Sequence, residues 1–159
     1  MKHLVSKSAL VCALAMMSAL SLWSEVKVVL TASKIVKTDG TEQRQPGDKA
    51  RPGEVIEYVA DYRNTDKRPV SNVKATLPVP NGMEYLPETA NPVKVTASTD
   101  DVHYAPVPLK RSVKNADGKV TEEMVPYSEY KSLRWDLGEI AGDAAKSVKA
   151  RMKVKTQSK

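Results

Sequence analysis

Few residues in this chain are suited to catalysis or metal binding. The 159 residues include one cysteine, Cys12, and two histidines, His3 and His103. One cysteine cannot form an intrachain disulfide, and a structural zinc site needs about four cysteine or histidine ligands. Nucleophilic catalysis needs a nucleophile beside a base, and the chain has no Gly-x-Ser-x-Gly motif. The sequence therefore predicts no metal, no cofactor and no nucleophilic enzyme.

The segment Asp100-Asp101-Val102-His103 is the one cluster that resembles a set of metal ligands. A stable divalent-ion site generally needs three or four convergent ligands, and no partner ligand is apparent near this cluster. We interpret it as a polar turn before a strand at residues 102–104.

A pair of acids for glycoside hydrolysis could still meet in space among the 19 aspartates and glutamates. A small β-sandwich rarely offers the deep cleft that this reaction needs, so we predict a non-enzymatic protein.

Positive charge is concentrated near the C-terminus of a chain with a net charge of +6. Four cations at alternate positions would share the outer face of one strand, about 6–7 Å apart, and we call them the basic stripe. The basic stripe consists of Lys149, Arg151, Lys153 and Lys155. It could contact an anionic envelope polymer or lipid headgroups, or it could be a solvated face that discourages aggregation. Nucleic acid is not expected as a partner, because the net charge is small for an exported domain.

Tyrosine and tryptophan must supply the large core side chains, because the chain has no phenylalanine. We expect Tyr127 and Tyr130 to be the exposed exceptions, since they lie among Pro126, Glu129 and Lys131. As exposed aromatic residues they could contact a sugar or a partner protein.

Strict alternation of apolar and polar residues predicts half-buried β-strands at residues 55–63, 73–79, 132–137 and 148–154. In the third of these, Trp135 is predicted to be a core anchor. Asp39-Gly40 indicates a chain reversal, and Asp117-Gly118 indicates a hairpin between residues 110–114 and 119–125. Short strands separated by turns predict an all-β, two-sheet antiparallel sandwich, with a closed barrel as the structural alternative. One domain is expected at residues 25–155, followed by a flexible tail at 156–159.

The N-terminus has the features of a secretory signal peptide. Lys2 and Lys7 precede an uncharged, mostly apolar run at residues 8–24, and small residues follow at Ala19 and Ser21. We expect a signal peptide at residues 1–21, cleaved after Ser21 or at another bond between residues 19 and 24. The alternative is an uncleaved membrane anchor, because the run is near the shortest that spans a bilayer. The expected location is periplasmic or secreted, with membrane attachment only if the signal is uncleaved.

Three segments, in order, resemble the bacterial conserved-repeat family, domain of unknown function eleven. Residues 51–65 contain Pro-Gly-Glu, a tyrosine-bearing strand and Asn-Thr; residues 71–83 contain Asn-Val, Leu-Pro and Asn-Gly; residues 135–141 read Trp-Asp-Leu-Gly-Glu-Ile-Ala. The resemblance implies an immunoglobulin-like sandwich in exported or surface proteins, often repeated as a spacer. The single copy and the long insertion at residues 96–130 instead favour a small envelope protein that works alone.

Two functional hypotheses follow from these observations. The first is a non-enzymatic, exported structural or interaction module of the bacterial cell envelope, whose partner is another envelope protein or an anionic envelope polymer. The alternative is a small binding protein for an anionic or carbohydrate component of the envelope.

Overall fold

The structure is a computed structural model that describes residues 26–47 and 49–156. The predicted signal peptide at residues 1–21 and most of the predicted tail lie outside these residues. The described chain is all-β, and its strands pair antiparallel throughout. Its one helical element is a short 3₁₀ turn, η1 (Tyr127–Glu129). No helix in residues 26–47 and 49–156 has the length and apolar character needed to cross a membrane.

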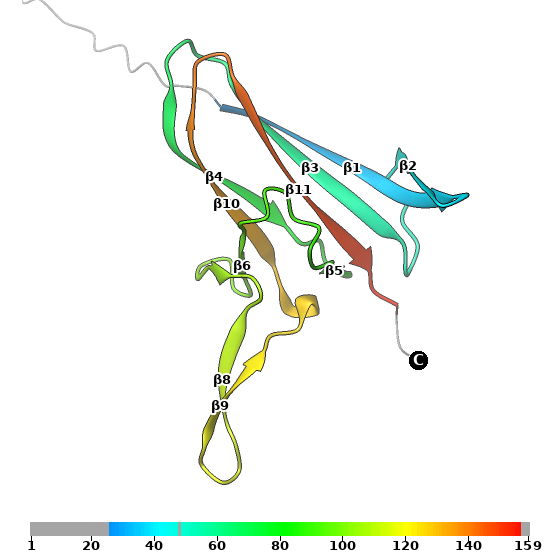
Figure 1. Ribbon diagram of the computed structural model, residues 1–159, viewed down its shortest axis with the longest axis vertical. Coiled ribbons are helices and arrows are strands. Elements are labelled where there is room, and N and C mark those ends of the chain that lie inside the picture. The colour runs from blue at the N-terminus through cyan, green and yellow to red at the C-terminus, as the bar shows by residue number, and fades with distance from the viewer. Residues whose placement is uncertain (1–25, 48, 157–159) are drawn as a thin grey trace, which may run out of the picture.

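Two sheets face each other and a hairpin projects from one end (Figure 1). The five-stranded sheet has the spatial order β2 (Thr41–Pro46), β1 (Val26–Thr38), β3 (Val55–Asn64), β11 (Ala145–Val154) and β5 (Met83–Tyr85). The four-stranded sheet has the order β4 (Val70–Pro78), β10 (Ser132–Ile140), β6 (Thr96–Ser98) and β7 (Ala105–Pro106). The projecting hairpin is formed by β8 (Lys110–Lys114) and β9 (Val120–Met124). The two separate sheets agree with the predicted sandwich rather than with a closed barrel.

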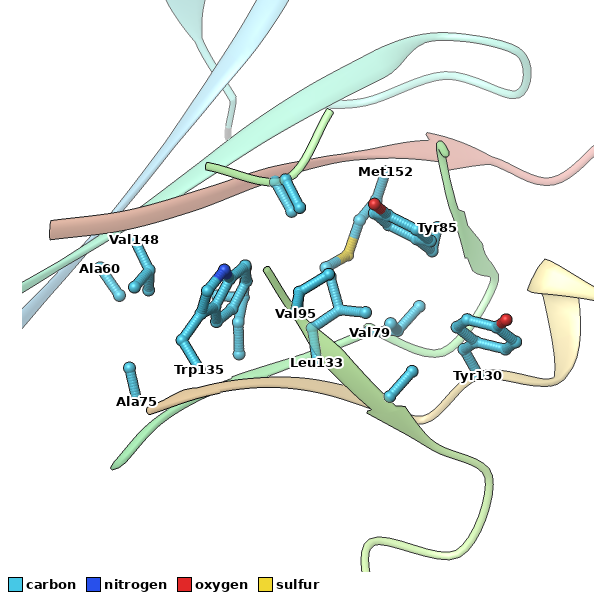
Figure 2. Close-up of a cluster of buried hydrophobic side chains, with 14 of the residues drawn as sticks. Ala60, Ala75, Val79, Tyr85, Val95, Tyr130, Leu133, Trp135, Val148 and Met152 are labelled. Carbon is cyan, nitrogen blue, oxygen red and sulfur yellow. The ribbon is translucent and has the colours of Figure 1, made fainter. Parts of the chain in front are cut away.

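The hydrophobic core lies between the two sheets, and Figure 2 shows Trp135 and Leu133 of β10 pointing towards Val148 and Met152 of β11. All four side chains are at most 1% exposed. The four strands predicted from alternation are all present, and Trp135 is confirmed as a core residue. Within the four predicted segments, the other buried apolar side chains also have the predicted parity: Ile56, Ala60, Tyr62, Ala75, Leu77, Val79, Leu137 and Ala150. Glu57 and Ser132 are the exceptions, because both are buried at positions predicted to face solvent.

Two loops that cross between the sheets lie side by side at one end of the sandwich, one joining β3 to β4 and the other joining β10 to β11 (Figure 1). Asn64, which is fully buried, links them. Its Nδ2 donates hydrogen bonds to the carbonyls of Arg68 at 2.7 Å and of Ile140 and Ala141 at 3.1 Å. The same amide therefore satisfies carbonyls from both loops, which would otherwise lose their partners on leaving the sheets.

The turns were predicted correctly at two hairpins. β1 and β2 are joined at Asp39-Gly40, and β8 and β9 are joined through a turn containing Gly118, whose φ is 83°.

The strand predicted at residues 102–104 is not formed: these residues belong to a loop before the short β7. The reason is that Asp100 accepts hydrogen bonds from the backbone N–H groups of Val102 and His103, which holds them in a turn.

Candidate anion-binding pocket

A pocket of about 560 Å³ lies over the outer face of the four-stranded sheet. Its lining comes from β4, β6 and β10, from the loop before β6 and from Tyr104. The residues that decide its chemistry are Lys74, Lys94, Tyr104, Arg134 and Asp136. Lys74, Arg134 and Asp136 alternate with the buried residues of β4 and β10, so the same period that buries Ala75 and Trp135 points Lys74 and Arg134 outward.

The register between strands brings these polar positions together. Lys74 of β4 is opposite Asp136 of β10, and Thr76 is opposite Arg134. On the other side of β10, Thr96 of β6 is also opposite Arg134. Directly opposite residues of antiparallel strands share a face, so Arg134 is at the centre of the polar face that lines the pocket.

Arg134 is held in one orientation by its neighbours. Its Cζ lies 3.5 Å from the centroid of the Tyr104 ring, and its Nε donates a hydrogen bond to Thr76 Oγ1 at 3.1 Å. A guanidinium stacked on an aromatic ring gains about 0.5–2 kcal/mol, more when it is desolvated. Within the described part of the chain, neither of its two terminal nitrogens donates a hydrogen bond to the protein. Both remain available to a ligand.

A chain of hydroxyl groups fixes the tyrosine beneath this guanidinium. The Tyr104 hydroxyl and Ser132 Oγ are 2.7 Å apart, and Ser132 Oγ in turn donates to Asp101 Oδ1 at 2.6 Å. Because the serine hydrogen is used on the carboxylate, Tyr104 is the donor in the first bond. Ser132 is 1% exposed, so the base of the pocket is anchored in the protein interior.

The loop that carries Lys94 is tied to both sheets. Trp135 Nε1 donates a hydrogen bond to the Pro92 carbonyl at 2.7 Å. Asn91 exchanges two backbone hydrogen bonds of 2.8 Å with Lys149 of β11. The wall formed by this loop is therefore preformed.

The pocket has an excess of positive charge. Lys74, Lys94 and Arg134 have no carboxylate within salt-bridge distance among residues 26–47 and 49–156. The one acid of the lining, Asp136, accepts a hydrogen bond from the Gly138 backbone N–H at 2.9 Å. An arginine with two free terminal nitrogens can bind a carboxylate or phosphate through two parallel hydrogen bonds. The arrangement is thus suited to an anionic group.

The basic stripe lies elsewhere, on the outer face of the five-stranded sheet, and it is interrupted. Arg151 forms ion pairs with Glu42, at 2.7 Å, and with Glu57, at 3.2 Å. The hydrogen bonds that Arg151 donates to the Glu42 carboxylate are the largest influence that raises the pKa of Arg151. Lys155 follows the end of β11 and donates to the Ser128 carbonyl at 2.9 Å. Lys149 and Lys153 are the stripe residues left on the face without an ion pair in the described chain.

Glu57 corrects one detail of the predicted alternation. We expected it on the solvent side of β3, but it is 3% exposed because Arg44 and Arg151 cover it. Burial raises the pKa of Glu57, and the hydrogen bonds from Arg44 and Arg151 outweigh burial, so its pKa is below the ordinary value. The outer face of this sheet is therefore a charge network and not a uniformly basic surface.

The prediction that Tyr130 is an exposed contact residue is wrong. Tyr130 is 3% exposed, and its hydroxyl accepts a hydrogen bond from the Leu109 backbone N–H at 2.7 Å. Its ring stacks on Tyr85 with 6.1 Å between centroids, and Tyr127, which is half-buried, lies edge-on to both rings. Tyr127 begins the turn η1 and Tyr130 directly follows it, so the turn packs both rings against one end of the core despite their polar neighbours in the sequence.

The Asp100 cluster is a turn, as predicted. His103 Nδ1 is 2.7 Å from Asp100 Oδ2, and this bond, with two from backbone N–H groups, holds the pKa of Asp100 far below its usual range. Over the described residues, no group of three or more histidine, cysteine, aspartate or glutamate side chains could hold a metal ion.

Comparison with known proteins gives no relative: no family model, no curated protein and no solved structure matches this chain. The resemblance to the conserved-repeat family stays a prediction, and the function has to be inferred from the pocket.

Proposed function

We propose that this chain is an exported, non-enzymatic interaction module of the bacterial cell envelope, and that it binds an anionic envelope polymer through the pocket centred on Arg134. The single observation that carries the proposal is the state of that arginine. It is stacked on Tyr104 and bonded to Thr76, yet among the described residues both of its terminal nitrogens lack a hydrogen-bond partner, and two further cations of the pocket lack an ion pair. A cation fixed in this way loses little conformational entropy when it binds a ligand.

The ligand class follows from the shape and charge of the pocket. Carboxylate and phosphate groups match the planar, two-pronged geometry of a guanidinium, and Lys74 and Lys94 add point charges at the rim. Tyr104 and Pro92 supply apolar surface beside the cations, which suits the carbon framework of an acidic sugar. An acidic glycan is therefore the preferred ligand.

Export and the immunoglobulin-like assignment belong to the same proposal. The order of Lys2 and Lys7, the apolar run and the small residues before residue 22 supports export. The two-layer antiparallel arrangement and the three resembling segments support an immunoglobulin-like sandwich. Those segments include β3, most of β4 and the second half of β10, which together form much of the two facing layers.

Binding to polygalacturonate, a polymer of sugar carboxylates, tests the proposal, with neutral dextran as the comparison ligand. The parent protein should bind polygalacturonate and not dextran, and affinity should fall with salt, since exposed charges are screened over about 8–10 Å. The double variant Lys74→Gln with Arg134→Gln should weaken binding about tenfold or more, because a hydrogen bond to a charged group contributes about 1.5–3 kcal/mol. Arg134→Lys should give an intermediate loss.

The matched control removes two charges from the basic stripe. The double variant Lys149→Gln with Lys153→Gln changes the net charge by the same amount as the pocket variant. If both double variants lose affinity equally, the attraction is a property of net charge and the pocket proposal fails. If only the stripe variant lost binding, the binding site would be on β11 and not in the pocket. Thermal unfolding of each variant separates lost contacts from lost structure.

A further inference from the structure

β1 leaves half of one edge of the five-stranded sheet unpaired. Residues Val26–Ile35 pair with β3 on one side, whereas β2 pairs only with residues Ser33–Thr38 on the other. β2 ends at Pro46, and Gly47 then passes so close to the Ala32 carbonyl that a Cβ there would lie 2.9 Å from its oxygen. Within the described chain, residues 26–31 therefore present backbone N–H and C=O groups at an open sheet edge.

This open edge carries exposed apolar side chains on both of its faces, although Lys27 and Thr31 flank Val29 on one of them. Val28, Val29 and Leu30 are 52%, 60% and 53% exposed. Register with β3 places Val28 and Leu30 on the face of Tyr62 and Ala60, and it places Val29 on the opposite face beside Asp61. A strand with apolar residues on both faces is typical of the inside of a sheet, not of its edge.

The edge also lacks the usual features that prevent pairing. Natural edge strands are commonly protected by proline, by a bulge or by several charges. Residues 26–31 contain no proline, pair with β3 without a register shift, and include one lysine, Lys27.

We propose that this edge pairs with the same edge of a second copy of the chain. A two-fold axis perpendicular to the sheet would set the two β1 strands antiparallel and join two five-stranded sheets into one. The axis would pass midway between the two Val29 residues, which would lie directly opposite each other. Val28 would then lie opposite Leu30 of the other copy, and Lys27 would lie opposite Thr31.

The sequence matches itself in this register. Each of the three apolar residues meets an apolar residue, and the lysines do not face each other. Centring the axis on Val28 or on Leu30 instead would set Val29 against Lys27 or Thr31. Pairing over so few residues buries less than the roughly 1,200–2,000 Å² of a standard interface, so the dimer is expected to be weak and concentration-dependent.

Disulfide trapping tests the register, in a Cys12→Ser background so that the introduced cysteine is the only one in the chain. Val29→Cys would place two cysteines directly opposite each other, with Cα atoms about 4.5–5.5 Å apart, which is within disulfide reach. Leu30→Cys would place the two cysteines diagonally, about 7–8 Å apart. We expect a disulfide-linked dimer from Val29→Cys and little from Leu30→Cys. Equal linkage in both variants would indicate random collision and overturn the proposal.

Sedimentation velocity over a wide concentration range tests the association itself. The parent chain should shift from monomer to dimer as concentration rises, and Val29→Lys, which places two like charges on the axis, should remain monomeric. Val93→Lys is the matched control, since it adds the same charge at a loop position that is 87% exposed. A parent protein that is monomeric at all concentrations overturns the proposal, and so does equal dissociation by Val93→Lys. Thermal unfolding confirms that each variant is folded.

Discussion

Replacing Trp135 tests how far the core and the pocket depend on one side chain. The indole is 1% exposed and lies between the facing sheets (Figure 2). At the same time its Nε1 donates to the Pro92 carbonyl, which holds the wall of the pocket. Two substitutions separate these roles: Trp135→Ala removes both, whereas Trp135→Phe keeps an aromatic ring in the core and removes the hydrogen bond.

The expected losses of unfolding free energy differ clearly. Truncating a buried tryptophan to alanine costs about 3–5 kcal/mol, a large part of the roughly 5–15 kcal/mol that stabilises a typical domain. For Trp135→Phe, the net hydrogen bond accounts for about 0.5–1.5 kcal/mol. Pro92 is in an exposed loop, and we expect water to replace the indole N–H at its carbonyl, which avoids the penalty of an unsatisfied acceptor.

Urea unfolding followed by far-UV circular dichroism is the appropriate assay, because both substitutions remove the tryptophan whose fluorescence would report on the core. With a slope of about 2 kcal/mol per molar urea, the alanine variant should unfold at a urea concentration about 1.5–2.5 M lower than the parent. The phenylalanine variant should shift by less than about 1 M on the same slope. An unchanged midpoint for Trp135→Ala would refute the core assignment, and equal shifts for both variants would refute the separation of packing from hydrogen bonding.

Two further predictions concern the loops and the charge network. Gly142→Ala should destabilise the protein by about 3 kcal/mol or more in thermal unfolding, since its Cβ would lie 1.9 Å from the Lys67 carbonyl oxygen. Gly40→Ala, which meets open space but has a φ of 79°, should cost only about 1 kcal/mol. Glu57 has a folded-state pKa below its ordinary 4.5, so it stabilises the protein above that pH, and this contribution is lost as pH falls through the folded pKa. Glu57→Gln should therefore flatten the acid side of the stability curve, and an identical slope in the two proteins would contradict this.

Alternation predicted β3, β4, β10 and β11 because each of these strands packs apolar residues of one face into the core and carries mostly polar residues on the other. β1 and β2 could not be predicted in this way, for two different reasons. β2 is exposed at every residue, so nothing selects apolar side chains on one face. β1 has Val28, Val29 and Leu30 in succession, and this apolar run interrupts the alternation of apolar and polar residues along the strand. Apolar and polar residues alternate along a strand only where one face of the strand is covered and the other faces solvent.

The pocket could not be predicted because its residues are brought together by strand pairing. Lys74 and Arg134 both occupy the outward phase of a predicted strand, but the sequence does not say that β4 and β10 are neighbours. Tyr130 was misplaced for a related reason. Its sequence neighbours are polar, whereas its neighbours in space are Tyr85, Tyr127 and Leu109.

Strand pairing also decides which cations can bind a ligand. On β11, Arg151 is opposite Glu57, and Arg44 of β2 adds a second guanidinium to the same carboxylate. Glu42 completes a network in which opposite charges are satisfied within the protein. On β10, Arg134 is instead opposite Thr76 and Thr96. Thr76 accepts a hydrogen bond from the guanidinium, but neither threonine carries a charge that would neutralise it. The basic stripe is thus paired with carboxylates at Arg151, whereas the charge of Arg134 is not balanced by a carboxylate among the described residues. This difference in cross-strand partners, more than the number of lysines and arginines, places the expected anion site on the four-stranded sheet.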